Sequence, residues 1–334
     1  MKFRIYIIIS VVLLLSPSVV KAQSDFDLSQ RFFNEAIYNP AATGNSFTTT
    51  FFLHLRNQWI GMEGAPTTEV FSVDSFLERY QSAVGLTITG DQIGKGSIST
   101  YSARAAYAFY IPFNDKSLLS LGVSAAVVCR KTDPTGNTIE ELPDPLFKSN
   151  TKYSPDFDFG VEYQGAFKVG VAVRHLGKKP TAEQPYDSKN IWAYASSRFN
   201  LMHHVSIEPM ISYIHRDRIN RYEFGALLYF LKSSTPRYYN DRFWVGAMYR
   251  INQQYSVMAG CHITPKIRIG YSFDYGLGDL GLISKKGTHE IFIAWQFNRL
   301  FYKDKRMDCP AYKRTDYDDK AKKDRMENLY YQFY

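Results

Sequence analysis

The chain has 334 residues, of which 45% are hydrophobic and 16% aromatic, and its formal net charge is +8. Beyond residue 22 the apolar residues are dispersed, so the sequence contains no further run long enough for a membrane-spanning helix. Three of the cations lie in the first 22 residues, and the modest excess that remains argues against a nucleic-acid-binding surface. The cysteines Cys129, Cys261 and Cys309 match neither a disulfide framework nor a metal motif.

Residues 1–22 are predicted to be a secretory signal peptide. Lys2 and Arg4 precede the apolar run Ile5–Leu15, and the segment ends on small residues at Ala22. Because the apolar run has only about 11 residues against the roughly 20 of a spanning helix, an N-terminal membrane anchor is the less favoured alternative. Residues 23–47 are then expected to form a periplasmic N-terminal segment.

Residues 48–297 carry a two-residue alternation that predicts β-strands. In Phe167–Leu176, Val169 and Val171 share one face while Gly170 and Ala172 share the other. The pattern recurs through the region, and we expect about fourteen strands, an even number as bacterial outer-membrane barrels require. Further clear examples are Asp156–Gln164, Lys266–Tyr275 and His289–Phe297.

The polar faces of these strands favour a membrane barrel over a secreted β-sandwich. A sandwich would cover its outside with charged residues, whereas here the polar faces mix charge with Gly, Ala and Ser, and aromatic residues gather near strand ends. A closed barrel also leaves no strand edge unpaired in lipid. We therefore predict an all-β fold, a transmembrane antiparallel β-barrel of about fourteen strands in an outer membrane.

The connections between strands predict the orientation of this barrel. If the N-terminus is periplasmic, the long connections Lys131–Tyr153, Gly177–Lys189 and Gly276–Lys286 face outward, and the turns near Gly165 and Pro265 face the periplasm. Asn252-Gln253 and Lys232–Asn240 fit this rule poorly. Residues 298–334 would be a periplasmic C-terminal tail, either solvated and disordered or a docking segment. Its last residues, ENLYYQFY, resemble a protease-tag remnant.

Six segments spread over the chain resemble one family. They are QRFFNEAIYNPAATG (30–44), RNQWIGMEGAP (56–66), GLTITGDQIG (85–94), SPDFDFGVEY (154–163), RIGYSFDYGLGDL (268–280) and GTHEIFIAWQF (287–297). Together they resemble the PorP/SprF family of type IX secretion membrane proteins over essentially the whole mature chain.

The resemblance implies an outer-membrane barrel that works with the type IX export apparatus of gliding and pathogenic Gram-negative bacteria. Its expected partners are a secreted cargo protein, such as an adhesin or its C-terminal domain, the translocon or periplasmic components, and outer-membrane lipid. It implies no cofactor and no catalytic residues. The alternative function is a solute channel of the porin or fatty-acid-transporter kind, which rests on the barrel alone.

The first outward loop is the candidate partner-binding site. Trp59 stands at the end of a predicted strand, Gly61 and Gly64 give the backbone freedom to turn, and Pro66 closes the turn. An exposed aromatic held on such a turn can anchor a partner. The competing interpretation is structural, because Trp59 can belong to the aromatic belt at the membrane interface.

Charged residues on the inward strand faces form a second candidate region. They are expected either to fill a narrow lumen with ion pairs or to line a conduit or cargo groove. The twelve inward positions are Arg56, Arg104, Asp156, Asp158, Glu162, Lys168, Arg174, Glu208, Lys266, Arg268, Asp274 and Glu290.

The sequence predicts no enzyme. His203, His204, His215, His262 and His289 are scattered, the chain lacks a Gly-x-Ser-x-Gly motif, and the HEIF stretch lacks the second histidine of a zinc helix. A barrel hydrolase with Ser and His on adjacent strands is the least favoured reading of these residues.

Overall fold

The structure, a computed structural model, describes residues 26–114, 117–133, 149–176, 189–202, 204–216, 219–231, 241–264, 266–278, 281 and 286–297. The predicted signal peptide and the predicted C-terminal tail lie outside the described residues. In the part of the chain that is described, no helix is long and apolar enough to cross a membrane.

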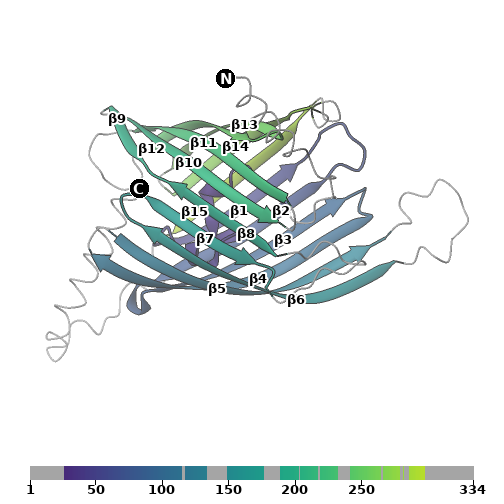
Figure 1. The fold of residues 1–334 in the computed structure, drawn as a ribbon, viewed down its shortest axis with the longest axis horizontal. Coiled ribbons are helices and arrows are strands. Elements are labelled where there is room, and N and C mark those ends of the chain that lie inside the picture. The colour runs from purple at the N-terminus through teal and green to yellow at the C-terminus, as the bar shows by residue number, and fades with distance from the viewer. Residues whose placement is uncertain are drawn as a thin grey trace, which may run out of the picture.

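Antiparallel β-strands form the fold, and they wrap around a common axis (Figure 1). Their bounds are β1 Thr49–Asn57, β2 Thr67–Leu77, β3 Ser82–Ile93, β4 Ile98–Asn114, β5 Ser117–Thr132, β6 Asn150–Gln164, β7 Lys168–Arg174, β8 Asn190–Ser196, β9 Phe199–Met202, β10 Val205–Arg216, β11 Ile219–Leu231, β12 Asp241–Arg250, β13 Gln254–Thr264, β14 Ile267–Gly276 and β15 Thr288–Phe297.

The sheet closes into a barrel because β15 pairs with β1 over their full lengths, from Thr49↔Phe297 to Asn57↔His289. β8 and the short β9 both pair with β10, one after the other, so they occupy a single position in the wall. The barrel therefore has fourteen wall positions, which confirms the predicted strand number and fold class.

The two faces of the wall follow the predicted alternation. Val169 and Val171 of β7 are exposed on the outside, whereas Gly170 and Ala172 between them are buried on the inside. On β1 the same contrast separates the exposed Leu53 and Leu55 from the buried His54. An apolar outer band of this kind is what a barrel presents to lipid.

The barrel has two ends with different connections. The end that carries the connections 58–66, 133–149, 175–189 and 277–287 is called here the long-loop end. The end that carries 78–81, 115–116, 165–167 and 265–266 is called the short-turn end; β1 begins and β15 finishes there.

The expected periplasmic N-terminal segment is where prediction and structure differ. Its described part, residues 26–48, lies inside the barrel and is called the plug. It contains three single turns of 3-10 helix, η1 Arg31–Phe33, η2 Glu35–Ile37 and η3 Pro40–Ala42. Leu28, Ile37 and Ala41 are almost fully buried, which a segment standing free of the barrel could not achieve.

Candidate functional site: the plugged lumen and the long-loop rim

The plug packs against two wall glycines in the short-turn half of the barrel, Gly122 and Gly160, which are called here the glycine floor. Gly122 of β5 and Gly160 of β6 are directly paired. A Cβ atom on Gly122 would lie 2.1 Å from the Ala41 backbone nitrogen, and one on Gly160 would lie 1.9 Å from the Asn39 side-chain oxygen. Only glycine allows the backbone of η3 to approach the wall this closely.

Hydrogen bonds fix η3 on this floor. The Asn39 side-chain oxygen accepts a bond from the Ala41 N–H (3.0 Å), which caps the turn, and its amide donates to the Tyr194 hydroxyl (3.0 Å). The Tyr110 hydroxyl of β4 donates to the Thr43 carbonyl (2.5 Å). The YNPAATG stretch thus contacts four wall strands, β4, β5, β6 and β8.

A buried ion cluster ties the start of the plug to β11 and β12 in the long-loop half. Arg31 contacts Asp27 (3.0 Å) and Glu223 (2.9 Å), and Arg250 contacts the same two carboxylates (2.8 and 2.6 Å). Arg221 is a further partner of Asp27. Buried charges are tolerated only when they are paired, so these contacts hold the plug and the wall in one arrangement.

A second cluster ties the same part of the plug to β1, β14 and β15. The backbone N–H groups of Ser29 and Gln30 each donate to one oxygen of Glu290 (both 2.8 Å). Arg56 contacts both Glu290 and Asp274 (both 2.8 Å), and the Ser29 hydroxyl donates to Asp274 (2.7 Å). Glu290 therefore serves as an acceptor for the plug and for the wall at once.

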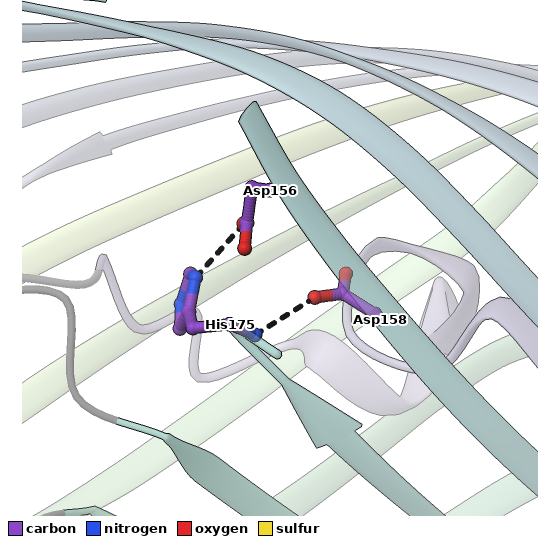
Figure 2. Close-up of side chains that lie close together, drawn as sticks. All are labelled: Asp156, Asp158 and His175. Carbon is purple, nitrogen blue, oxygen red and sulfur yellow. Dashed lines mark hydrogen bonds and ion pairs between the residues drawn. The ribbon is translucent and has the colours of Figure 1, made fainter. Parts of the chain in front are cut away.

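A third cluster lies on the wall itself and contains a group with metal-ligand chemistry. Asp156 and Asp158 of β6 and His175, directly after β7, bring ligand atoms within 4.8 Å of one another (Figure 2). The His175 Nδ1 lies 2.8 Å from Asp156, and its backbone N–H donates to Asp158 (3.1 Å). Arg104 contacts both carboxylates. Because that guanidinium already supplies the balancing cation, we interpret the cluster as an ion-pair network.

A fourth cluster lies in the short-turn half. Lys168 at the start of β7 contacts Glu35 of the plug (2.6 Å). Glu162 of β6 accepts a bond from the Asn45 amide of the plug (2.7 Å) and another from the Tyr194 hydroxyl. Plug residues are therefore bonded to the wall along the whole length of the lumen.

Most of the twelve predicted inward charges lie where they were expected. Eleven of them are buried or half-buried, and the network contacts above account for most of these, whereas Lys266 is exposed at the turn before β14. The prediction for Lys266 is wrong because the residue precedes the strand and does not share its alternation. The contacts described favour the ion-pair interpretation of the lumen charges.

Sequence reasoning missed the plug residues that complete these networks. Asp27, Arg31 and Glu35 recur at every fourth position before the first strand, and each has a partner on the wall. That spacing is the signal that could have predicted burial of this segment. Regularly spaced charges between Leu, Phe and Ile indicate a segment whose charges and apolar side chains both have partners. Asn39 continues the same spacing.

The four predicted partner-binding residues lie together in the loop 58–66 at the long-loop end. Trp59 has a positive φ of 47° and is half-buried. Its backbone N–H donates to the Thr288 hydroxyl (3.2 Å). Gly61 (φ 94°) and Gly64 (φ 73°) also adopt left-handed backbone, where glycine is favoured. Pro66 is buried and its carbonyl accepts from the Gln58 N–H (2.9 Å).

Neighbouring loops hold this loop in place. The Gly94 N–H donates to the Gly64 carbonyl, and the Ile60 N–H donates to the Gly287 carbonyl (both 2.9 Å). Ile60 and Met62 are its exposed large apolar side chains, at 36% and 42%. Of the large side chains in this loop, Trp59 is half-buried, whereas Ile60 and Met62 face solvent.

The histidines considered for catalysis are not gathered into one site. His215 bonds Asn220 (2.7 Å), and His289 bonds Tyr271 (2.6 Å), on different strands at the surface. His262 packs against the ring of Trp244 on the inside of the wall (5.7 Å between centroids). His203 lies outside the described residues.

A closed barrel with an apolar outer band and a lumen occupied by its own N-terminal segment defines a plugged membrane β-barrel. The model of one family, described as type IX secretion system membrane protein PorP/SprF, matches residues 20–295. The chain therefore belongs to the PorP/SprF family, as its motifs predicted, and is an outer-membrane β-barrel of type IX secretion.

Solved structures with a similar fold include transport barrels. A FadL homologue from Pseudomonas aeruginosa is 12% identical, with 79% of this chain and 94% of that chain covered and a TM-score of 0.44. The toluene transporter TbuX from Ralstonia pickettii is 11% identical, with 79% and 92% covered and a TM-score of 0.47. These TM-scores are below 0.5, so the likeness carries no argument about function. No protein of curated function matches the chain.

Proposed function

We propose that this barrel binds a secreted type IX cargo protein, such as an adhesin or its C-terminal domain, and delivers it to the cell surface or retains it there. The observation that carries the proposal is the occupied lumen. The plug bonds β11 and β12 through buried ion pairs and β14 and β15 through hydrogen bonds to Asp274 and Glu290, an arrangement suited to a rigid holding protein.

The proposal places the long-loop end outside the cell and the short-turn end in the periplasm, after export by the predicted signal peptide. The type IX translocon or periplasmic components would then meet the short-turn end and the tail that follows β15. In a gliding organism the cargo would be an adhesin used in motility. Outer-membrane lipid would surround the apolar band, and the function needs no cofactor or chemical step.

Within this proposal the loop 58–66 is the first surface to test. Its backbone bonds to two neighbouring loops make it a firm platform, and Ile60 and Met62 offer an apolar contact at its tip. Pre-organised loops with exposed apolar residues are suited to partner binding, because little conformational entropy is lost when the partner docks. Trp59, Gly61, Gly64 and Pro66 would maintain the shape of that platform.

The decisive experiment compares cargo display in cells that carry defined variants. Deleting the protein should strip one secreted adhesin from the surface while unrelated type IX cargo still arrives. The double variant Ile60→Ser/Met62→Ser should reproduce this loss with the barrel still folded and heat-modifiable on a gel. Ile251→Ser is the matched control, since Ile251 is 38% exposed in another loop at the long-loop end.

Trp59→Ala separates the two interpretations of that residue. Loss of display together with loss of heat-modifiability would assign Trp59 to the scaffold, as its half-buried position predicts. Loss of display from a folded barrel would assign it to recognition. Unchanged display in the Ile60 and Met62 variant would remove the loop from the proposal.

The alternative function is an outer-membrane solute channel, and a cavity of about 450 Å³ at the short-turn end favours it. A pull-down of the detergent-solubilised protein discriminates the two functions. Co-purification of a large secreted protein supports cargo binding, whereas bilayer conductance without a protein partner supports the channel.

A further inference from the structure

The cavity at the short-turn end has aromatic walls. Phe32 and Phe33 of the plug, Trp244 of β12 and Tyr229 of β11 all line it. The rings of Phe33 and Trp244 are in contact, with centroids 5.2 Å apart. Its volume of about 450 Å³ falls within the range of small-molecule sites in proteins, about 300 to 1,000 Å³.

Two residues that line this cavity have a side-chain donor that is unsatisfied in the described part of the chain. The indole N–H of Trp244 has no acceptor, although the residue is only 1% exposed. The Nε of Arg268 on β14 also has no acceptor, while its terminal nitrogen donates to the Phe33 carbonyl (3.2 Å). A buried donor without a partner costs free energy, so an acceptor from a ligand would stabilise both groups.

The charges around the cavity favour an anion. Lys168 is offset by Glu35, and the Arg198 guanidinium lies over the Tyr229 ring (3.8 Å), whose hydroxyl donates to Glu208. In the residues that the structure describes, Arg268 has no carboxylate within ion-pair distance.

We infer that this cavity binds a carboxylate carried on an apolar chain or ring, with the carboxylate on Arg268 and Trp244 and the apolar body against Phe33. A guanidinium recognises a carboxylate better than other small anions of one charge, because the two planar groups match. The apolar body gains contact with rings that are already in place. This inference does not depend on the proposed cargo function.

The test uses the full chain in lipid nanodiscs and the probe 2-bromododecanoate, whose bromine is next to the carboxylate and quenches a nearby tryptophan. Trp59 and Trp295 are first changed to Phe, since Trp295 is 47% exposed on the lipid side and would report partition into the bilayer. Trp192 and Trp244 then remain. Quenching of their signal should saturate with 2-bromododecanoate and should disappear in Trp244→Phe, in which Trp192 still emits. The neutral 2-bromododecan-1-ol should give no saturable quenching.

Arg268→Gln should weaken the apparent affinity for the probe by about tenfold or more, because a charge-assisted bond is lost. Arg79→Gln, at an exposed arginine of the short-turn end, is the matched control and should leave the affinity unchanged. If Arg268→Gln does not fold, the comparison of the acid with the alcohol in the chain that keeps Arg268 still tests the inference. Excess dodecanoate should displace the probe, and dodecyltrimethylammonium should not.

The same displacement assay identifies the source of the carboxylate. Displacement by dodecanoate alone supports a free amphiphile as the ligand. Displacement also by a short apolar peptide with a free C-terminus, but not by its amide, supports the terminus of a partner chain. Equal quenching by the acid and the alcohol, or an unchanged affinity in folded Arg268→Gln, would overturn the inference.

Discussion

In the long-loop half of the lumen the plug contacts the wall through ion pairs, whereas towards the short-turn half it also packs through aromatic rings and glycine. Arg31 and Asp27 represent the first half, with Glu223 as their wall partner. Phe33 represents the second, packed between Trp244 and Phe292 (5.2 and 5.1 Å). Charge fixes the orientation of the plug because its partners are specific, and the rings fill space without such specificity.

The difference between the halves predicts different costs of disruption. Removing one member of an ion cluster leaves other buried charges unbalanced, and the cost falls on the whole network. Removing one ring leaves a cavity, whose cost depends on how far its neighbours collapse. The predictions that follow test this contrast from the largest expected effect to the smallest.

The largest effect is expected from Glu223→Gln. This change leaves Arg31, Arg221 and Arg250 with Asp27 as their remaining carboxylate in the cluster, so the free energy of unfolding should fall by about 3–5 kcal/mol. Urea unfolding in lipid vesicles, followed by tryptophan fluorescence, measures it. Glu69→Gln, on the exposed face of β2, should change the stability by less than about 0.5 kcal/mol. Equal effects of the two variants would contradict the cluster's role.

Phe33→Ala tests the aromatic half. Because Phe33 is only partly buried, we expect a loss of about 3 kcal/mol, near the lower limit for truncating a core phenylalanine. The same unfolding assay measures this change. Phe113→Ala, at a ring that is 61% exposed, is its control and should cost much less. A loss larger than that of Glu223→Gln would reverse the ranking of the two halves.

The barrel itself was predictable from the sequence because its signal is local. Alternation in a single strand, as at Val171 and Ala172, shows which side faces outward, and each strand repeats the same information. One wall position is interrupted after Ser196, and β9 resumes it at Phe199 in the same register against β10. The four residues of β9 are all exposed, so the alternation that strand prediction relies on is absent there.

The plug was not predictable in the same way, because its contacts are distant in the chain. Ser29 and Glu290 are 261 positions apart, and the spacing of Asp27 and Arg31 around Ser29 does not identify which wall residues they meet. The resemblance identified the YNPAATG stretch but not its location. The candidate loop shows a similar limit: its four predicted residues do lie together, whereas exposure of Ile60 and Met62 depends on bonds from two other loops.

A smaller effect is expected from Gly122→Ala. The added methyl group would collide with the backbone of Ala41, so η3 must shift, at a cost of about 1–3 kcal/mol. Planar-bilayer recordings should show more frequent opening, because the plug is held less firmly. Gly90→Ala is the control, since its nearest neighbour, the Tyr101 ring, is 3.4 Å away. Identical recordings from the two variants would mean that the glycine floor does not hold the plug.

The smallest effect is expected at the long-loop rim, where Glu63 pairs with Lys95 of the next loop. The hydrogen bond from Lys95 lowers the pKa of the Glu63 carboxyl. A lowered pKa means that the pair stabilises the fold above the ordinary pKa of a glutamate and loses this contribution as the pH falls through the lowered value. Because the carboxyl is fully exposed, Glu63→Gln should leave the midpoint of thermal unfolding unchanged at pH 7 and at pH 3. A clear drop at pH 7 that disappears at pH 3 would show that the rim, like the plug, depends on charge.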